Sequence, residues 1–285
     1  MKIFGEKGVE RLLSVVAFSA ISALALIALF IFIEGLPFLF RYGVKDFLFS
    51  SDWRPESGKF GIYPMISASF WVMLGAMLVG APLGIAGAIF LAEFTPKTVM
   101  HIVKPAIELL AAVPSVIYGF IGVVVLAPII REIFGGPGLS VLAGAIILGI
   151  MILPTVISIS IDSILAVPVS FREGSLALGA TVWQTVHMLT IKAAKSGIVA
   201  SIILGMGRAI GETMAVIMVT GNSVMIPNSP LDSARTLTAN IALEMSYATG
   251  MHREALFATG VVLFIVIIIL NSIASVAIRK KVIVK

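Results

Sequence analysis

The sequence has no cysteine, little charge and few histidines. Without cysteine, neither a disulfide framework nor a thiolate metal site can form. Charged residues make up 12% of the 285 positions, whereas a soluble domain carries roughly 25%. The three histidines, His101, His187 and His252, lie in different segments, so we expect no metal site. These absences exclude an ordinary soluble domain and a disordered chain.

Apolar residues take the place of the missing charge. They make up 59% of the chain, and the mean hydropathy is +1.10. A helix of about 20 apolar residues crosses the hydrocarbon core of a bilayer, and runs of that length recur along the sequence. We therefore predict an all-α membrane protein with six transmembrane helices, one of them interrupted by Arg208 and Glu212. The predicted spans are 12–33, 60–92, 109–130, 133–161, 196–220 and 255–278.

The positive charges lie in the breaks between these spans, which argues against nucleic-acid binding. Loops on one side carry twelve Lys and Arg residues, and loops on the other side carry seven. Because cytoplasmic loops are enriched in Lys and Arg, we predict that both termini are cytoplasmic. The first apolar run is too long for a signal peptide, so we expect it to be retained.

The spans divide the chain into four parts. We predict an N-terminal transmembrane helix over 1–34, with a helix stop at Glu34-Gly35-Leu36-Pro37, and an outer loop over 35–64. A core of five helices follows over 65–278, and a basic cytoplasmic tail over 279–285.

The inner loop, residues 166–195, has the pattern of two short amphipathic helices. Ser170 and Glu173 fit the S-x-x-E capping box, which marks a helix N-terminus. Gly179 predicts a turn, and Trp183 and His187 fall one turn apart in a second helix. From this pattern alone, the two helices are compatible with resting on lipid headgroups or with binding a partner.

The same loop resembles the cytoplasmic motif of membrane subunits of bacterial ABC importers. That motif reads E-A-A, three residues, then G, followed by an apolar-x-L-P ending. Small residues replace both alanines here, and Lys192 stands where the pattern has proline. The resemblance implies that this loop couples the chain to an ATPase. The matching residues are Glu173, Gly174, Ser175, Leu176 and Gly179, preceded by Ser170.

Further segments resemble the PstC family of phosphate-importer permeases, from about residue 61 to the end. They include Val113–Gly119, Leu204–Val216 and Arg235–Ala242. The resemblance implies an ABC type I importer permease fold, and a non-catalytic subunit of an ATP-driven phosphate importer. It also implies three partners: a second, PstA-like permease, a PstB-like ATPase dimer and an extracytoplasmic PstS-like phosphate-binding protein.

No G-x-x-x-x-G-K-[ST] phosphate loop occurs in the chain. We therefore expect no cofactor in this chain, with ATP and Mg bound by the partner ATPase.

Arg208 and Glu212 are four residues apart, so a continuous helix would place them on one face. An Arg near the bilayer centre costs at least about 2.5–3.5 kcal/mol and therefore must face protein or water. One interpretation is a structural ion pair. The other is that Arg208, Glu212 and the adjacent Thr213 line the substrate path, with a guanidinium that binds an oxyanion bidentately and an ion pair that acts as a gate.

Three alternatives stay open from the sequence. A permease for another oxyanion, such as molybdate or sulfate, would share the architecture. An ion-coupled secondary carrier or a channel would need no cytoplasmic docking helix. An intramembrane enzyme would need a nucleophile with a base, or a metal cluster, and the sequence shows neither at helical spacing.

Overall fold

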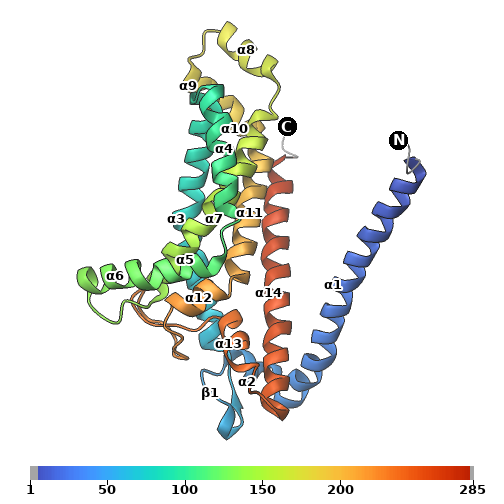
Figure 1. Ribbon diagram of the computed structural model, residues 1–285, viewed down its shortest axis with the longest axis vertical. Coiled ribbons are helices and arrows are strands. Elements are labelled where there is room, and N and C mark those ends of the chain that lie inside the picture. The colour runs from blue at the N-terminus through green and yellow to red at the C-terminus, as the bar shows by residue number, and fades with distance from the viewer. Residues whose placement is uncertain (1–5, 283–285) are drawn as a thin grey trace.

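A computed structural model describes residues 6–282 and shows an elongated helical bundle with one small hairpin at its end (Figure 1). Within these residues, five helical segments are long and apolar enough to cross a membrane, or six if the bent pair Val182–Ala193 and Lys195–Gly211 forms one span. The predicted all-α membrane fold is confirmed. The last three residues of the predicted basic tail lie outside the described residues, and 279–282 belong to the final helix.

The elements, in chain order, are α1 (Glu6–Tyr42), α2 (Val44–Phe49), β1 (Trp53–Arg54), η1 (Pro55–Ser57), β2 (Lys59–Phe60), α3 (Tyr63–Ile89), η2 (Phe90–Phe94), α4 (Lys97–Ala111), α5 (Ser115–Ile121), η3 (Gly122–Leu126), α6 (Ala127–Phe134), α7 (Val141–Leu165), α8 (Val169–Ala177), α9 (Val182–Thr185), η4 (Val186–Thr190), α10 (Ile191–Ala193), α11 (Lys195–Gly211), α12 (Met214–Val219), α13 (Leu237–Glu244) and α14 (Gly250–Val282). Of these, η1 is a 3₁₀ helix, and η2, η3 and η4 are π-helices.

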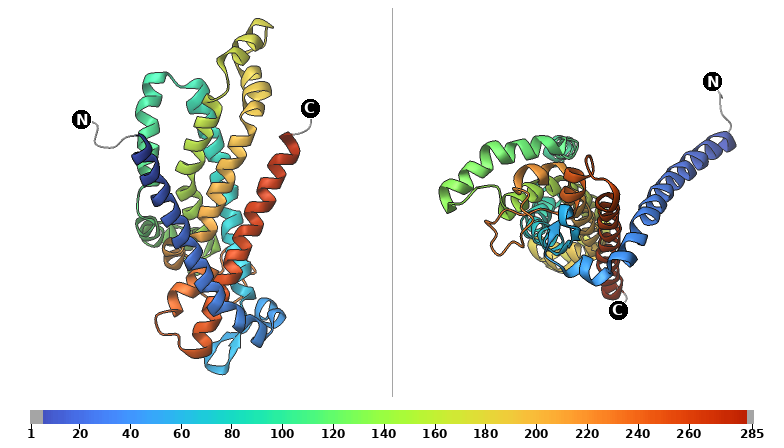
Figure 2. Two further views of the ribbon diagram at one scale, coloured as in Figure 1. Left: turned by 90° about the vertical axis from the view of Figure 1, so that its right-hand side faces the viewer. Right: turned by 90° about the horizontal axis from the view of Figure 1, so that it is seen from below.

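The first helix does not stop at 34–37 as predicted, because it continues through Pro37 to Tyr42. Gly35 crosses α14 closely: a Cβ there would lie 2.8 Å from the carbonyl carbon of Phe257. Phe30 meets Phe257 edge to face at 5.5 Å. This packing offsets the hydrogen bond that a proline removes from a helix. Toward its start, α1 diverges from α14 (Figure 2), and its side chains from Glu10 to Ala20 are exposed.

The predicted outer loop is a folded cap. We use "hairpin cap" for the end of α1, α2, the antiparallel β1–β2 pair, α13 and the start of α14. In β1–β2, Trp53 pairs with Phe60 and Arg54 pairs with Lys59. Phe38 stacks on Tyr42 and meets Phe47 and Phe60 edge to face. The cap core buries Phe38, Phe47, Trp53, Phe60, Ile62, Leu237 and Leu256.

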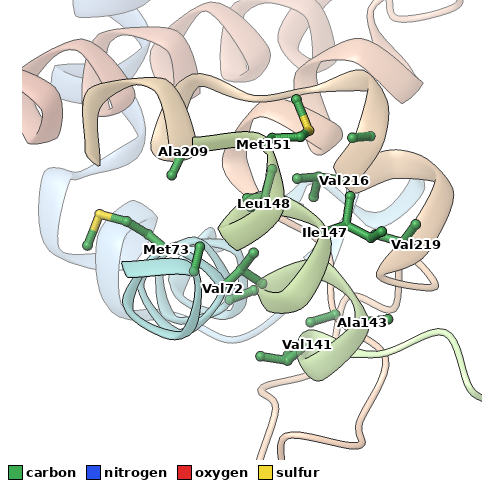
Figure 3. Close-up of a cluster of buried hydrophobic side chains, with 14 of the residues drawn as sticks. Val72, Met73, Val141, Ala143, Ile147, Leu148, Met151, Ala209, Val216 and Val219 are labelled. Carbon is green, nitrogen blue, oxygen red and sulfur yellow. The ribbon is translucent and has the colours of Figure 1, made fainter. Parts of the chain in front are cut away.

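The main core lies where α3, α7, α11 and α12 meet, and Figure 3 shows part of it, including Val72, Leu148, Met151 and Val216. Small residues bring α3 and α7 close together, as in other membrane helix pairs. A Cβ at Gly80 would lie 2.6 Å from the Gly149 carbonyl oxygen.

The third apolar run differs most from its prediction over 109–130. The helix breaks at 112–114, between α4 and α5. The segment Ser115–Phe134 then runs crosswise to α3 and α7 (Figures 1 and 2). Two glycines let it approach α12: a Cβ at Gly119 would lie 2.7 Å from Met218 Sδ, and one at Gly122 would lie 2.5 Å from Val219 Cγ1.

Candidate functional site

The predicted continuous helix through Arg208 and Glu212 is wrong. Helix α11 ends at Gly211, and Glu212 is extended, with φ −68° and ψ 131°. The Glu212 carboxylate instead accepts a hydrogen bond of 3.2 Å from the Ala215 amide and caps the start of α12. The spacing of four residues therefore does not bring the two charges together, and Arg208 and Glu212 form no ion pair in residues 6–282.

Arg208 reaches across to two other helices. Its Nη1 donates to Thr155 Oγ1 on α7 at 3.3 Å, and its Nη2 donates to the Ala111 carbonyl at 3.4 Å. Ala111 is the last residue of α4, where the helix dipole places partial negative charge. The guanidinium is partly buried, and both acceptors are neutral. Both hydrogen bonds of Arg208 are therefore long, and the guanidinium forms no ion pair with a carboxylate in the described residues.

Two helix breaks lie at this level of the bundle. Both α5 and α12 turn aside there and pack against each other (Figure 1). At the second break, Thr213 Oγ1 donates to the Gly211 carbonyl at 3.3 Å. The Glu212 carbonyl accepts from Thr238 Oγ1 at 2.9 Å, which ties the break to α13. Broken helices whose ends line a path near the midplane are typical of transporters.

The second candidate site is the loop 166–195, which we call the coupling loop. It projects beyond the end of the bundle (Figure 1). Helix α8 buries no residue, and Leu178 is 91% exposed. Glu173, Gly174 and Leu176 are exposed, whereas Ser175 is half-buried. Gly179 adopts φ +85°, the left-handed conformation that the predicted turn requires. An exposed helix with apolar side chains offers a surface for another protein.

The predicted capping box of Ser170 and Glu173 is not formed. Helix α8 begins at Val169, directly after Pro168 as N-cap. Pro168 starts the helix two residues earlier than predicted, so Ser170 lies inside the first turn. The loop does hold a capping box, at α9: Thr181 Oγ1 accepts from the Gln184 amide at 3.3 Å, and Gln184 Oε1 accepts from the Thr181 amide at 2.8 Å. The sequence T-V-W-Q carries this signal.

A buried carboxylate organises the opposite end of the bundle, and the sequence patterns did not reveal it. Glu244 Oε1 accepts from Arg235 Nη1 at 2.5 Å, and Oε2 pairs with Trp53 Nε1 at 2.9 Å and His252 Nε2 at 2.7 Å. Trp53 comes from the hairpin, His252 from α14, and Arg235 from the segment just before α13. The Arg235–Ala242 segment was recognised only by its family resemblance, because residues so distant in sequence give no local signal.

This cluster forms one wall of a cavity of about 1090 Å³ at the hairpin cap. Tyr247 also lines it. Partial desolvation of the hydroxyl and the negative charge of Glu244 raise the pKa of Tyr247, although this residue is 65% exposed. On the rim of the hairpin, the hydrogen bond and the charge of Lys59 lower the pKa of Asp52. Within residues 6–282, no three His, Asp or Glu side chains gather as a metal site would require.

Comparison with known proteins defines the class. Residues 80–284 match the family described as binding-protein-dependent transport system inner membrane component. The chain belongs to this family and is a multi-pass inner-membrane permease of an ABC importer.

Named relatives are more specific. The chain is 44% identical over 252 residues to a protein of Bacillus subtilis named "Probable ABC transporter permease protein YqgH", covering 86% of this chain and 82% of that protein. It is 36% identical to "Phosphate transport system permease protein PstC" of Mesorhizobium japonicum, covering 80% and 76% of the two chains.

Solved structures show the same fold at low sequence identity. A chain in the crystal structure of a bacterial alginate ABC transporter, in complex with an alginate pentasaccharide-bound periplasmic protein, matches with a TM-score of 0.64 at 14% identity, covering 96% of each chain. A chain of the inward-facing methionine ABC transporter MetNI matches with a TM-score of 0.57 at 18% identity, covering 77% of this chain and 94% of the other. These matches confirm the ABC type I importer permease fold.

Proposed function

We propose that this chain is a permease subunit of an ATP-driven importer of inorganic phosphate. Relatives named phosphate transport permease, at 31–36% identity over most of the chain, support the substrate class. The observation that carries the proposal is Arg208, a cation at a double helix break without a carboxylate partner in the described residues.

The contacts of Arg208 suit transient anion binding. A guanidinium binds a phosphate oxyanion bidentately, with hydrogen bonds about twice as strong as those between neutral groups. The two present hydrogen bonds are long and go to neutral oxygens, so an arriving anion can replace them. Glu212 and Thr213 shape the break beside it, and the Glu212 charge disfavours tight retention of an anion. A transported ion needs such weak binding in order to leave.

The coupling loop indicates how the chain is oriented in the membrane and which protein binds it. We assign it to the cytoplasm, where α8 docks on a PstB-like ATPase dimer that binds ATP and Mg. Both termini then lie on the cytoplasmic side, because the start of α1 and the end of α14 point toward the α8 end (Figure 1). A PstA-like second permease completes the path by alternating access, and a PstS-like phosphate-binding protein docks at the hairpin cap.

The test is reconstitution of the chain with the second permease, the ATPase and the binding protein in liposomes. ATP-dependent uptake of phosphate is measured beside sulfate and molybdate. Arg208→Gln should lower phosphate uptake about tenfold or more, since a hydrogen bond to a charged group contributes about 1.5–3 kcal/mol. Phosphate uptake by Arg208→Lys should be intermediate, because lysine keeps the positive charge but lacks the paired N–H donors with which a guanidinium binds an oxyanion bidentately.

Arg131→Gln is the matched control. Arg131 also donates to a backbone carbonyl, that of Pro137 at 3.2 Å, but it is exposed on α6. Full phosphate uptake by Arg208→Gln would overturn the proposal that Arg208 binds the transported anion. If the transporter prefers sulfate or molybdate, the ABC importer architecture stands and the phosphate assignment is overturned. Uptake without the ATPase would favour an ion-coupled carrier.

A further inference from the structure

The π-helical end of α3, Phe90–Phe94, touches both halves of the coupling loop. We propose that this segment, η2, is the joint through which the coupling loop moves the membrane helices, and that the Arg172–Glu93 ion pair is its tie. Arg172 and Glu93 are thus positioning residues for transport. The inference rests on the proposed function, because it assumes that an ATPase moves α8.

Arg172 fastens α8 to two other elements. Its Nη2 and Nε donate to Glu93 Oε1 at 2.8 and 3.2 Å. Its Nη2 and Nη1 also donate to the carbonyls of Ile164 and Val167, at 2.8 and 3.1 Å. Ile164 lies in the last turn of α7, where free carbonyls carry partial negative charge. One guanidinium therefore holds α8, the end of α7 and the end of α3 together.

This ion pair differs from an ordinary surface pair in its burial. The Glu93 side chain is 9% exposed and that of Arg172 is 20% exposed, although α8 around it is open to solvent. Removing one member would leave a desolvated charge behind, which is strongly unfavourable. Because water competes less for a buried ion pair than for an exposed one, the Arg172–Glu93 pair can keep α8 attached to η2 when α8 is displaced.

An aromatic contact joins the second half of the loop to the same place. Phe94, the last residue of η2, packs on Trp183 of α9, with ring centroids 6.2 Å apart. Trp183 in turn stacks on His187 of η4, at 6.2 Å and an interplanar angle of 12°. Adjacent residues of η2, Glu93 and Phe94, therefore contact α8 and α9 respectively.

The coupling loop is itself braced, so it can move as one body. Ser175 Oγ on α8 lies 2.9 Å from Thr185 Oγ1 on α9, in a hydrogen bond across the turn. The Ala180 amide donates to the Ser175 carbonyl at 3.2 Å. A displacement of α8 by a partner would therefore carry α9 with it, and both would pull on η2.

The η2 segment is connected to Arg208 through helix α4. After η2 the chain turns at Thr95 and Pro96 into α4, whose last carbonyl, at Ala111, accepts from Arg208. A shift of α4 would change that long hydrogen bond and alter how Arg208 is held. Single-turn π-helices often mark functional sites because their hydrogen bonding departs from the α-helix. Here the π-turn lies at the end of α3, between the loop and the helix that reaches Arg208.

The test measures coupling in the assembled transporter in liposomes. Arg172→Gln, Glu93→Gln and the double variant are compared with Lys195→Gln, a control at an exposed basic residue of the same end. We expect the single variants to retain ATP hydrolysis and to import severalfold less phosphate per ATP. The double variant should import no less phosphate per ATP than either single variant, since each single variant already removes the same Arg172–Glu93 ion pair. A purely structural role would lower hydrolysis and uptake together with the amount of assembled complex, and that result would overturn the proposal.

A second measurement reports on the joint directly. Because the chain lacks cysteine, nitroxide labels can be placed at Ala177→Cys on α8 and His101→Cys on α4 alone, both at exposed positions. We expect the distance between α8 and α4 to stay constant through the ATP cycle, and to change in Arg172→Gln. An unchanged distance in Arg172→Gln would overturn the joint. If the unmodified transporter neither binds the ATPase nor imports phosphate, the proposed function fails instead, and the two failures are thereby distinguished.

Discussion

The two ends of the bundle are stabilised in different ways. The hairpin cap has its own aromatic core and a buried carboxylate with three partners from separate segments. At the other end, α8 buries nothing, and Arg172 attaches it to the helices. The cap is thus complete within this chain, whereas the coupling loop presents a surface that another protein would complete. Substitutions at the cap should therefore change folding, and substitutions on α8 should change assembly.

The largest effect should come from Glu244→Ala in the cap. It removes the acceptor of three hydrogen bonds and leaves Arg235 without its carboxylate in a largely buried site. Breaking a buried ion pair costs about 3–5 kcal/mol. We expect a clearly lower midpoint of thermal unfolding of the full chain in detergent. Glu56→Ala, at an exposed residue of the same hairpin, should leave the midpoint unchanged, and equal midpoints for the two variants would contradict a self-sufficient cap.

A smaller effect, of another kind, is expected from Leu178→Ala at the α8 end. The side chain is 91% exposed, so the free energy of unfolding should change by less than about 0.5 kcal/mol. Binding of the ATPase should weaken by about 1 kcal/mol or more if Leu178 is an anchor of the interface. Titration of the ATPase onto the reconstituted permease pair measures this. A lower unfolding midpoint with unaltered ATPase binding would reverse the comparison.

The smallest effect should come from Asp52→Asn on the rim of the cap. Lys59 lowers the pKa of Asp52 in the folded chain, so the pair stabilises the fold above the unfolded-state pKa, and this contribution is lost as the pH falls through the folded-state pKa. Unfolding midpoints of the variant and the parent should differ slightly at neutral pH and converge at acid pH. High salt should also bring them together, because exposed pairs are screened. A difference that persists at acid pH would mean that Asp52 acts through packing.

The sequence located most of the apolar helices, because bilayer thickness constrains every apolar run, but it joined α4 and α5 into one span. It could not predict direction: Ser115–Phe134 has the composition of a span and yet runs crosswise. Pro114 marks the break, but hydropathy does not encode the direction that the chain takes after it. The prediction that Arg208 and Glu212 lie on one helix face was wrong for a related reason, since a spacing of four residues brings side chains together only while the helix continues. Gly211 was the available signal for its end.

Long-range polar clusters were outside the reach of sequence patterns. Trp53 and Glu244 are 191 residues apart, and Glu93 is 79 residues from Arg172. Periodicity and capping describe neighbours along the chain, so these pairs needed the tertiary structure. The motif of the coupling loop, by contrast, is contiguous, and sequence located the loop although it misplaced the helix start at Ser170.

The composition of the hairpin cap has a consequence for the order of synthesis. Phe38, Phe47 and Trp53 are made early, but they share one buried core with Leu237 and Leu256, and Trp53 donates to Glu244, near the other end of the chain. Contacts so distant in sequence form late and slowly. While the chain is being made, these early aromatic residues can pack only on one another, so the side that Leu237 and Leu256 cover later, and the Trp53 indole N–H, remain exposed. A chain truncated before α13 would lack Leu237, Glu244 and Leu256 and would keep this surface exposed, and exposed hydrophobic surface makes an incompletely folded chain prone to aggregation.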